Sequence, residues 1–404
     1  MKEKIKLGVL FGSRSTEHDV SIVSALQLMS MADPFRYEVI PVYISKKGEW
    51  FTGGALWKME TYLNFDPRKS KLTRVYPDLT ARSHALVAVK RGKPFMGETR
   101  YAAAKLDCVI PVFHGMNGED GSMQGVLEMM DLPYASTGVA GSAVGMDKVM
   151  MKRIFRGFDF PVLKDTSLTR TAFEKDEEAA CEAVEKELPY PVYVKPANLG
   201  SSIGVDRAEN REQLKKALRV AFTLDRRVLI EEGLTNPREV NCSVLGFDEE
   251  VYPSVVEQPV RHTDDKLLTY EGKYLQGGNA SGMAALSRII PAPISEEDTQ
   301  KVQRIAVSIF KALDCKGVVR VDFMMDEATG GLYITEINTI PGSLAFYLWD
   351  KTGEGLPYRK LIDRLVDLAF EAHRQKDRGT SSFQSEIISM ALSNEQSGAK
   401  GSKA

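Results

Sequence analysis

Four polar side chains in one short segment constrain this chain more than any other feature. Arg320 and Asp322 lie two residues apart in an apolar run, and Glu336 and Asn338 lie two residues apart in the next run. Because successive strand residues point to opposite faces of a sheet, each pair lies on a single face. The segment between the runs predicts a turn. A hairpin centred on Thr329 sets Asp322 opposite Glu336 and Arg320 opposite Asn338.

Two carboxylates that face each other across a hairpin destabilise it unless a cation neutralises their charge. Two acids and an asparagine carbonyl form an all-oxygen ligand set suited to Mg²⁺, and a neighbouring arginine suits phosphate oxygens. The alternative is a solvated hairpin whose polar face points to water. The remaining hairpin residues are apolar, however, which predicts largely buried strands and favours a metal and nucleotide site. We expect Leu332 and Ile334 on the face of Glu336. On the opposite face we expect Val319, Val321, Phe323, Tyr333 and Ile337.

Length and composition are those of a soluble enzyme with more than one domain. A chain of 404 residues exceeds what one core usually supports, which predicts two or three domains. The net charge of −2 lacks the basic excess of nucleic-acid-binding proteins, so we expect no nucleic-acid partner. No apolar stretch is long enough to span a membrane, so we expect no membrane partner. The dispersed cysteines predict reduced thiols in a cytoplasmic protein. They are Cys108, Cys181, Cys242 and Cys315.

Residues 1–140 predict an α/β domain. A helix is expected to begin near Asp19, and Thr16 with Asp19 resembles a capping box. Residues 45–99 show weak periodicity and are interpreted as an elaboration of this domain. The apolar face of the helix is expected to carry Val20, Val23 and Leu26. The predicted strands are residues 4–11, 37–44 and 106–113.

Residues 141–237 and 238–376 predict two further α+β units, and residues 377–404 a disordered tail. The last unit contains the hairpin and a closing helix at residues 358–374. In the central unit, the predicted helices are residues 146–155 and 211–222. The predicted strands there are residues 161–165, 189–195 and 227–231.

A second chemical signal is a glycine- and serine-containing loop that follows Lys195, which ends a predicted strand. The loop reads Pro-Ala-Asn-Leu-Gly-Ser-Ser-Ile-Gly and ends at Gly204. Backbone N–H groups and hydroxyls of such a loop can bind phosphates while the ammonium group adds positive charge. The segment is not a Walker A loop, since GxxxxGK[ST] is absent. A flexible turn with an incidental lysine is the alternative. The hairpin with the predicted Mg²⁺ ligands, here called the metal-type hairpin, lies in the same chain and favours the phosphate interpretation.

Nine short motifs follow one another in a fixed order along the chain. They are FGSRSTEHDVS, HGMNGEDG, MDK, VKPANLGSSIGV, VLIEEG, REVNCSVLG, KY, RVDF and EINTIPG. This order resembles the D-alanine–D-alanine ligases of the ATP-grasp superfamily, and the resemblance spans roughly residues 4–365. It implies an ATP-grasp fold that combines α/β and α+β parts, with a Rossmann-like domain at the N-terminus and ATP held between the central and C-terminal units.

The resemblance implies that Lys148 and Lys195 contact the phosphates of ATP. Glu231 and its neighbours would meet the adenine, and Glu239 would bind the ribose hydroxyls. Lys273 would face the nucleotide from a lid formed by residues 269–274, which closes to keep water from the intermediate. The loop residues expected to cover the phosphates include Gly200, Ser201 and Ser202.

For the metal, the resemblance implies two Mg²⁺ ions, for which Mn²⁺ can substitute. Asp322 and Glu336 would hold one ion, and Glu336 with Asn338 the other. Arg320 would neutralise charge that builds on the transferred phosphoryl group and on the tetrahedral intermediate.

On the substrate side, Glu17 matches the acid that receives the ammonium group of the first substrate. Ser201 and Tyr274 match its partners, which tie down the active-site loop. The alternative for Glu17 is an acid that complements a helix N-terminus, but its place after a strand favours the functional role. His114 occupies a similar loop, and structural and substrate-binding roles are both open for it.

One departure from the family pattern concerns the second substrate. Family members usually place a serine several residues after the Pro-Gly of EINTIPG to receive the carboxylate of that substrate. Here Gly342 is followed directly by Ser343, and Tyr347 stands near the usual serine position. We interpret Gly342 and Ser343 as substrate-binding residues, with Tyr347 as the alternative. Tyr274 favours an amine acceptor over a hydroxy acid.

The activity that the resemblance implies is the ATP-dependent joining of two D-alanines through an acyl phosphate, for peptidoglycan precursor synthesis. The small-molecule partners would be ATP and D-alanine. Two alternatives are a ligase with another second substrate, such as D-serine or D-lactate, and a nucleotide-binding protein without catalysis. The sequence leaves the oligomeric state open, a homodimer included.

Overall fold

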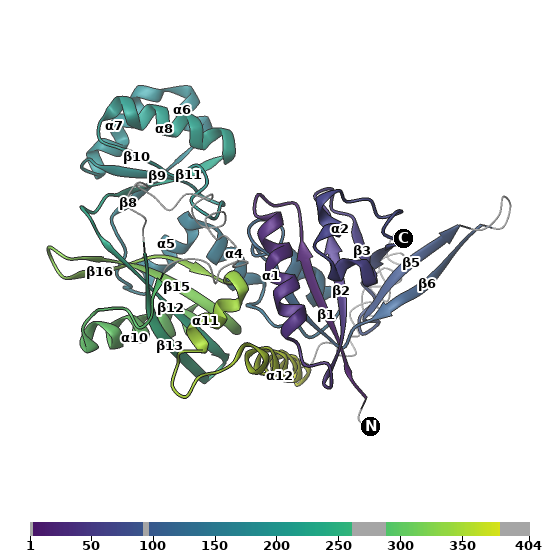
Figure 1. The fold of residues 1–404 in the computed structure, drawn as a ribbon. Coiled ribbons are helices and arrows are strands. Elements are labelled where there is room, and N and C mark those ends of the chain that lie inside the picture. Colours follow the sequence, from purple (N-terminus) through teal and green to yellow (C-terminus); the bar gives the residue numbers. More distant parts are fainter. Residues whose placement is uncertain (1–2, 92–96, 261–287, 380–404) are drawn as a thin grey trace, which may run out of the picture.

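The computed structural model describes residues 3–91, 97–260 and 288–379. Strands within these ranges form sheets of seven, four and five strands. Figure 1 shows the first sheet with its helices on one side of the molecule, and the other two sheets above one another on the other side. The fold therefore combines α/β and α+β parts, as predicted. Within the described ranges, no helix combines the length and the apolar character needed to cross a membrane.

The first sheet has the strand order β6-β5-β4-β3-β2-β1-β7. Strands β1, β2 and β7 pair in parallel, and β3 to β6 extend the sheet with antiparallel pairs. Figure 1 shows β5 and β6 projecting from the rest of the molecule. The elements of this part are β1 (Ile5–Gly12), α1 (His18–Met31), β2 (Tyr37–Ile44), β3 (Trp50–Thr52), η1 (Gly54–Trp57), α2 (Glu60–Leu63), β4 (Thr73–Pro77), β5 (Ala85–Arg91), β6 (Glu98–Lys105), β7 (Cys108–Val112) and α3 (Ser122–Met129). The three predicted strands are confirmed within two residues at each end.

The start of α1 differs from the prediction. Its N-cap residue is Glu17, and no side chain caps the helix, so the predicted capping box is wrong. The loop is held instead by Ser15, whose hydroxyl accepts from the Glu17 backbone N–H at 3.1 Å and donates to the His114 carbonyl at 2.6 Å. The predicted apolar face is also only partly correct. Val20 is buried, but Val23 and Leu26 are half-buried. The buried apolar residues of α1 are Val20, Ile22, Ala25, Leu28 and Met29.

The second sheet has the order β10-β9-β11-β8. Helices α6, α7 and α8 lie on its outer side (Figure 1). Its elements, with the two helices that precede them, are α4 (Val139–Met146), α5 (Lys148–Gly157), β8 (Asp165–Thr169), α6 (Arg170–Lys175), α7 (Glu177–Glu187), β9 (Val192–Pro196), β10 (Asp206–Ala208), α8 (Arg211–Leu224) and β11 (Arg227–Glu232). The strands predicted near β9 and β11 and the helix predicted at α8 are confirmed.

Of two further predictions for this region, one is confirmed and one is wrong. The helix expected over residues 146–155 is α5, which lies two residues later at each end. It begins after Asp147, whose side chain accepts hydrogen bonds from its first backbone N–H groups. The strand expected over residues 161–165 begins only at Asp165. The residues before it cross to the third sheet instead, where the Pro161 carbonyl accepts a hydrogen bond from the Ile334 backbone N–H at 2.8 Å.

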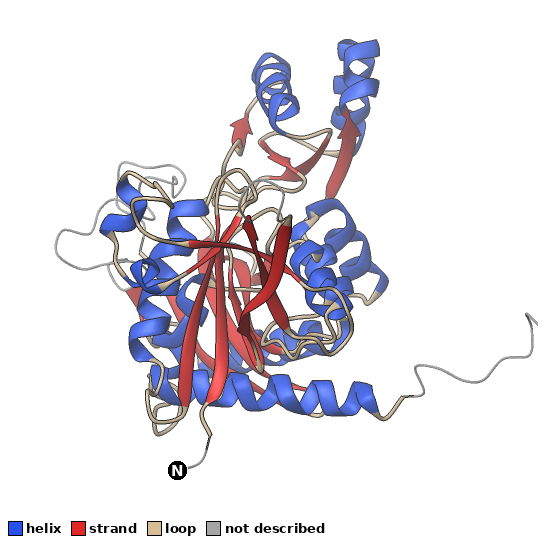
Figure 2. Ribbon diagram, turned by 90° about the vertical axis from the view of Figure 1, so that its right-hand side faces the viewer, coloured by secondary structure: helices blue, strands red, loops and turns tan. Residues whose placement is uncertain are grey.

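The third sheet has the order β14-β13-β12-β15-β16, and all its described pairs are antiparallel. Helix α12 extends three residues beyond the predicted closing helix, and Figure 2 shows it lying below the strands. The predicted disordered tail lies mostly outside the described residues. The elements are β12 (Arg238–Phe247), β13 (Glu250–Pro259), β14 (Arg288–Ile289), α10 (Glu296–Ala312), β15 (Gly317–Asp326), β16 (Gly331–Asn338), η3 (Gly342–Ala345), α11 (Phe346–Trp349) and α12 (Tyr358–Asp377).

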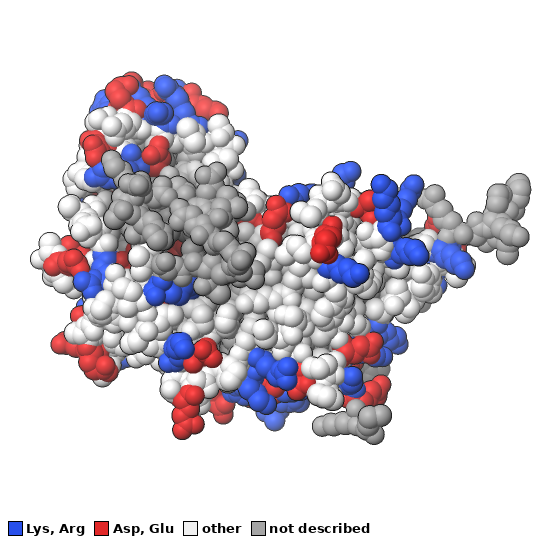
Figure 3. Space-filling view, viewed as in Figure 1, with Lys and Arg blue, Asp and Glu red and all other residues white. Residues whose placement is uncertain are grey.

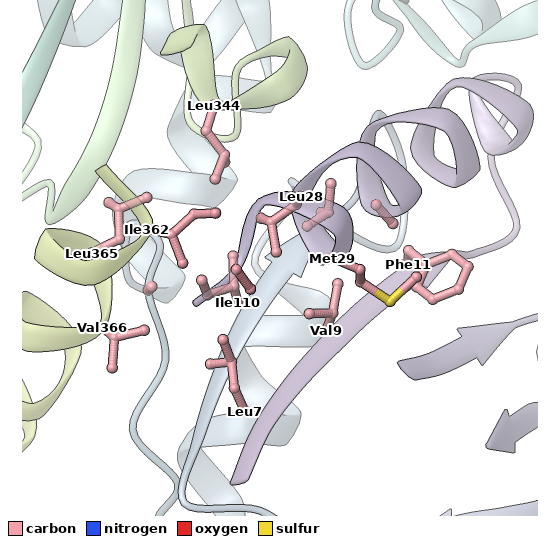
Figure 4. Packing of buried hydrophobic residues seen from close by; sticks show 14 of the residues in the cluster. Leu7, Val9, Phe11, Leu28, Met29, Ile110, Leu344, Ile362, Leu365 and Val366 are labelled. Carbon is pink, nitrogen blue, oxygen red and sulfur yellow. The ribbon is translucent and has the colours of Figure 1, made fainter. Parts of the chain in front are cut away.

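A shared hydrophobic core joins the first sheet to the C-terminal elements. Buried residues of β1, such as Leu7, pack in one cluster with Leu28 of α1, Leu344 of η3 and Leu365 of α12 (Figure 4). Burial of such side chains contributes on the order of 2 kcal/mol each to folding. This core fixes the loops at the carboxyl ends of β1 and β7 against the third sheet. On the face shown in Figure 3, acidic and basic side chains are interspersed.

Candidate active site

A cavity of about 250 Å³ is lined by residues of the second and third sheets and by residues that follow strands β1 and β7 of the first sheet. It brings together all but one of the predicted site residues that the structure describes. The exception is Ser343. Lys273 and Tyr274 lie outside the described residues. The predicted residues that line the cavity are Glu17, His114, Lys148, Lys195, Gly200, Ser201, Ser202, Glu231, Glu239, Arg320, Asp322, Glu336, Asn338 and Gly342.

The hairpin register is confirmed at the polar residues. Asp322 pairs with Glu336, and Arg320 pairs with Asn338. Beyond this point a bulge shifts the register, so that Phe323 pairs with Ile334, and Thr335 is the extra residue. The bulge reverses the alternation of faces.

The prediction that Leu332 and Ile334 share the face of Glu336 is therefore wrong. Both are buried in the same core cluster as Ile337, on the side away from the cavity. Tyr333, expected in the core, is only half-buried. The bulge thus allows β16 to fill the core near the turn and still direct Glu336 to the cavity.

Asp322 is the centre of the polar face. It accepts hydrogen bonds from Arg320 Nε at 2.6 Å, from Arg320 Nη2 at 2.7 Å and from Asn338 Nδ2 at 3.0 Å. Burial raises the pKa of Asp322, the charge of Arg320 opposes this shift, and the charge of Glu336 adds to it. Glu336 Oε2 lies 3.6 Å from Lys148 Nζ. The face offers carboxylate oxygens and one amide oxygen, a donor set that fits Mg²⁺.

Next to this face lies a buried cluster of charges that was predicted only in part from the sequence. The Glu231 carboxylate forms ion pairs with Lys152 and with Lys195, and the side chains of Lys152 and Glu231 are each 1% exposed. Lys152 also donates to the Ile334 carbonyl at 2.9 Å. Burial raises the pKa of Glu231, but the two lysines outweigh burial and lower the pKa to about 2. Lys152 follows Lys148 by four residues on α5, and this spacing could have indicated a shared face.

Where the first sheet meets the cavity, the Ser201 hydroxyl donates a hydrogen bond to Oε1 of Glu17. Two glycines flank this carboxylate closely. A Cβ atom on Gly200 would lie 2.6 Å from Glu17 Oε2, and one on Gly115 would lie 2.9 Å from it. Side chains at these positions would displace the carboxylate. The loop around Ser201 is also tightly turned, since Ser201 and Ser202 have φ values of 49° and 57°.

His114 and Glu119 lie beside Glu17. His114 Nε2 is 3.1 Å from the Ser24 hydroxyl, and burial lowers the pKa of His114 to about 4. Glu119 accepts from the backbone N–H groups of Gly115 at 2.6 Å and Ile340 at 3.3 Å. Burial and the charge of Glu17 raise the pKa of Glu119 to about 8. Glu119 was not among the residues predicted from the sequence, although it stands within the HGMNGEDG motif.

The region expected to receive the second substrate differs from the prediction. The Ser343 hydroxyl is buried and donates to Gln27 Oε1 at 2.8 Å, outside the cavity. Tyr347 does line the cavity, but its hydroxyl donates to Glu257 Oε1 at 3.0 Å. Ser343 is turned away because residues 343–345 all have positive φ values, between 47° and 56°.

The two α+β units built on the second and third sheets enclose lysines, carboxylates and a glycine-serine loop. Together with the partly parallel first sheet, this arrangement defines an ATP-grasp ligase. Models of the D-ala D-ala ligase N-terminus and C-terminus match residues 6–137 and 154–367. The chain belongs to the D-alanine–D-alanine ligase family.

Relatives and solved structures agree with this assignment. The D-alanine–D-alanine ligase of Bacillus cytotoxicus is 39% identical over 379 residues, which are 93% of this chain and 98% of the relative. That of Geobacillus thermodenitrificans is 38% identical over 385 residues, 94% of this chain and 100% of the relative. The D-alanine–D-alanine ligase structure from Coxiella burnetii has a TM-score of 0.73 at 27% identity, covering 93% of this chain and 97% of the other. The VanG D-Ala:D-Ser ligase from Enterococcus faecalis has a TM-score of 0.73 at 31% identity, covering 91% and 100%.

Proposed function

We propose that this chain uses ATP and Mg²⁺ to join two D-alanines, giving D-Ala-D-Ala, ADP and phosphate for peptidoglycan precursor synthesis. Family membership supports the reaction. The observation that carries the proposal for this site is the pairing of Asp322 with Glu336 in the same cavity as Glu17. One end of the cavity then offers ligands for a metal-bound phosphate, and the other an acid for an amino-acid ammonium group.

The nucleotide would lie between the second and third sheets. Lys148 and Lys195 would contact its phosphates, and the loop of Gly200, Ser201 and Ser202 would cover them. Glu231, fixed by its two lysines, would hold the base-binding end in place. Glu239 would bind the ribose hydroxyls.

Asp322, Glu336 and Asn338 would hold Mg²⁺, which when bound would neutralise the β- and γ-phosphate oxygens. Mn²⁺ would substitute because it accepts the same oxygen ligands. Arg320, which lies against Asp322, would stabilise the negative charge of the transferred phosphoryl group.

The reaction would proceed in two steps. A carboxylate oxygen of the first D-alanine attacks the γ-phosphorus of ATP, forming a C–O–P linkage as the bond to ADP breaks. Glu17, fixed by Ser201, would hold the ammonium group of this substrate so that its carboxylate faces the phosphate. The unprotonated amine of the second D-alanine then attacks the acyl carbon, phosphate leaves, and the amine releases a proton. His114, kept neutral by burial, would bind the first substrate as a hydrogen-bonding group rather than as a cation.

D-Serine is the second candidate acceptor, because a D-Ala:D-Ser ligase is among the similar structures. Phosphate release should be measured with D-alanine alone and with D-alanine plus D-serine, D-lactate or L-amino acids, and the products resolved by mass. We expect Mg²⁺-dependent release of phosphate with D-alanine alone and D-Ala-D-Ala as product. If a mixed product predominates when D-alanine and another acceptor are supplied at equal concentrations, that acceptor, and not D-alanine, is the second substrate. No phosphate release with any D-amino acid would reject the proposed function.

A further inference from the structure

Four side chains that the proposed mechanism does not use form one cluster on the cavity wall. Tyr347 Oη and Asn241 Nδ2 donate to Glu257 Oε1 at 3.0 and 3.3 Å. Arg288 Nη1 lies 3.3 Å from Glu257 Oε2, and its guanidinium carbon lies 3.7 Å from the centre of the Tyr347 ring. The side chain of Glu257 is 3% exposed and that of Arg288 is 12% exposed. All four residues line the cavity.

The strand register places this cluster relative to the metal-type face. Glu257 on β13 pairs with Asn241 on β12, Asn241 pairs with Asp322 on β15, and Asp322 pairs with Glu336 on β16. Glu257, Asn241, Asp322 and Glu336 therefore form one row across four neighbouring strands. Neighbouring strands are about 4.8 Å apart, so Glu257 lies about 10 Å from Asp322 along the row. This distance leaves room for a small amino acid between the phosphoryl site at Asp322 and the pair of Glu257 and Arg288.

Glu257 acts within the cluster as a positioning group. Tyr347, Asn241 and Arg288 already donate to its two oxygens, so few acceptor sites remain for a substrate ammonium group. It also balances the buried charge of Arg288. The ring of Tyr347 supports one face of the guanidinium group, which fixes the plane of its donors.

The cations that line the described part of the cavity are Lys148, Lys195, Arg288 and Arg320. Lys195 and Arg320 contact the carboxylates of the proposed nucleotide and metal sites, and Lys148 lies near Glu336. Arg288 is the cation of this set that lies next to β13, on the side of Asp322 away from Glu336. The hydroxyl of Tyr347 donates its single proton to Glu257. A carboxylate bound at this end therefore needs another donor.

We propose that Arg288, held in place by Glu257 and Tyr347, binds the carboxylate of the second substrate. The inference rests on the proposed function and adds to it the group that selects α-amino acids as acceptors. The guanidinium group offers paired N–H donors that match a carboxylate. The acceptor amine would then point along the row toward the acyl phosphate.

The test compares two acceptors, one with a carboxylate and one without. Wild type and Arg288→Gln are supplied with ATP, D-alanine and either a range of D-alanine concentrations or excess hydroxylamine, which converts an acyl phosphate to D-alanyl hydroxamate. Dipeptide and hydroxamate are resolved by mass. We expect Arg288→Gln to lower kcat/KM for the acceptor D-alanine about 10- to 100-fold, mainly through KM. Hydroxamate formation should stay near the wild-type rate.

Three further variants sharpen the result. Arg288→Lys keeps the charge without the paired donors and should show an intermediate loss. Tyr347→Phe keeps the ring but not the bond to Glu257, so it should raise acceptor KM less than Arg288→Gln. Arg238→Gln removes an arginine of the same sheet that pairs with Glu327 outside the cavity, and should change neither product.

Two outcomes would overturn the inference. If Arg288→Gln and Arg288→Lys reduce hydroxamate and dipeptide equally, Arg288 supports the whole site and does not bind the acceptor carboxylate. If they reduce neither product, the carboxylate lies elsewhere. A failure of the proposed function is distinguishable from both, since wild type would then form neither product.

Discussion

The hydroxyl of Ser201 donates a hydrogen bond to the carboxylate of Glu17, although 184 positions separate the two residues in the chain. Glu17 precedes α1 of the first sheet, and Ser201 belongs to the loop after β9 of the second sheet. The bond therefore links the proposed binding site of the first substrate to the loop proposed to cover the ATP phosphates. Gly200 permits this contact because a side chain there would meet the Glu17 carboxylate.

Replacing Gly200 with alanine should separate Glu17 from Ser201. A Cβ atom 2.6 Å from Glu17 Oε2 must displace either the carboxylate or the loop. We expect the KM for the first D-alanine to rise about 10-fold, the effect of losing one charge-assisted hydrogen bond. Steady-state kinetics measures it. Gly157→Ala is the control, because a Cβ atom on Gly157 meets no atom within 4 Å. Unchanged kinetics in Gly200→Ala would show that this contact is dispensable.

Asp322→Asn, Glu336→Gln and Asn338→Ala should each lower Mg²⁺-dependent turnover by about 100-fold or more, because each removes an oxygen ligand or its charge. The melting temperature should fall little in Glu336→Gln, since this change relieves repulsion between paired carboxylates. Rates over a Mg²⁺ titration and thermal unfolding measure both effects. Glu327→Gln, an exposed acid at the turn of the same hairpin, is the control. Near-wild-type rates in all three variants would show that this hairpin does not bind the metal.

Lys195→Ala should raise the KM for ATP more than that for D-alanine, and Glu17→Gln should do the reverse. Each change removes one charge partner of a substrate from an enclosed site, so the affected KM should rise about 10- to 100-fold. Both constants are measured for each variant. Asp19→Asn, which alters an exposed acid two residues after Glu17, should change neither. Equal effects of both variants on both substrates would contradict the division of the cavity into two ends.

Glu231→Gln should destabilise the protein by about 3–5 kcal/mol, because it leaves the ammonium groups of Lys152 and Lys195 buried without their shared carboxylate. Adding Lys152→Met should restore part of the loss, since one of the two charges is removed. Urea unfolding of the single and double variants measures this coupling. Additive losses would show that the three charges do not act as one unit.

The same group predicts an acid dependence. Glu231 has a pKa of about 2 in the folded protein and about 4.3 in an unfolded chain. A carboxylate with a lowered pKa stabilises the fold above its unfolded pKa, and this stability is lost as the pH falls from about 4.3 toward 2. The stability of Glu231→Gln should therefore fall less than that of wild type over this window.

His114 should remain uncharged at neutral pH. Its pKa is about 4 in the folded protein and about 6.5 when unfolded, so its contribution to stability is present above pH 6.5 and is lost as the pH falls to 4. Relative to His114→Gln, the wild type should lose on the order of 2 kcal/mol over this window. Denaturant unfolding at several pH values measures the difference, in which other titrating groups cancel. An imidazole NMR signal of His114 that titrates near pH 6.5 would contradict the prediction.

The metal-type hairpin was predictable because its information is local. Strand alternation and a turn centred on Thr329 suffice to pair Asp322 with Glu336, and the structure has this register. The bulge at Thr335 was not predictable. The bulge lets Ile334 fill a core that residues of α5 and α10 share, while Glu336 still faces the cavity. That requirement comes from outside the hairpin.

The sequence by itself determined the strands at both ends of the first domain, the polar row of the hairpin, and the family to which the chain belongs. Only the tertiary structure decided that Lys152 shares Glu231 with Lys195, that Ser343 turns away to Gln27, and that Glu257 and Arg288 join Tyr347. Each of these contacts depends on how separate strands and helices are registered against one another. Burial and the matching of charges across the whole fold set that registration, and no local pattern of residues carries it.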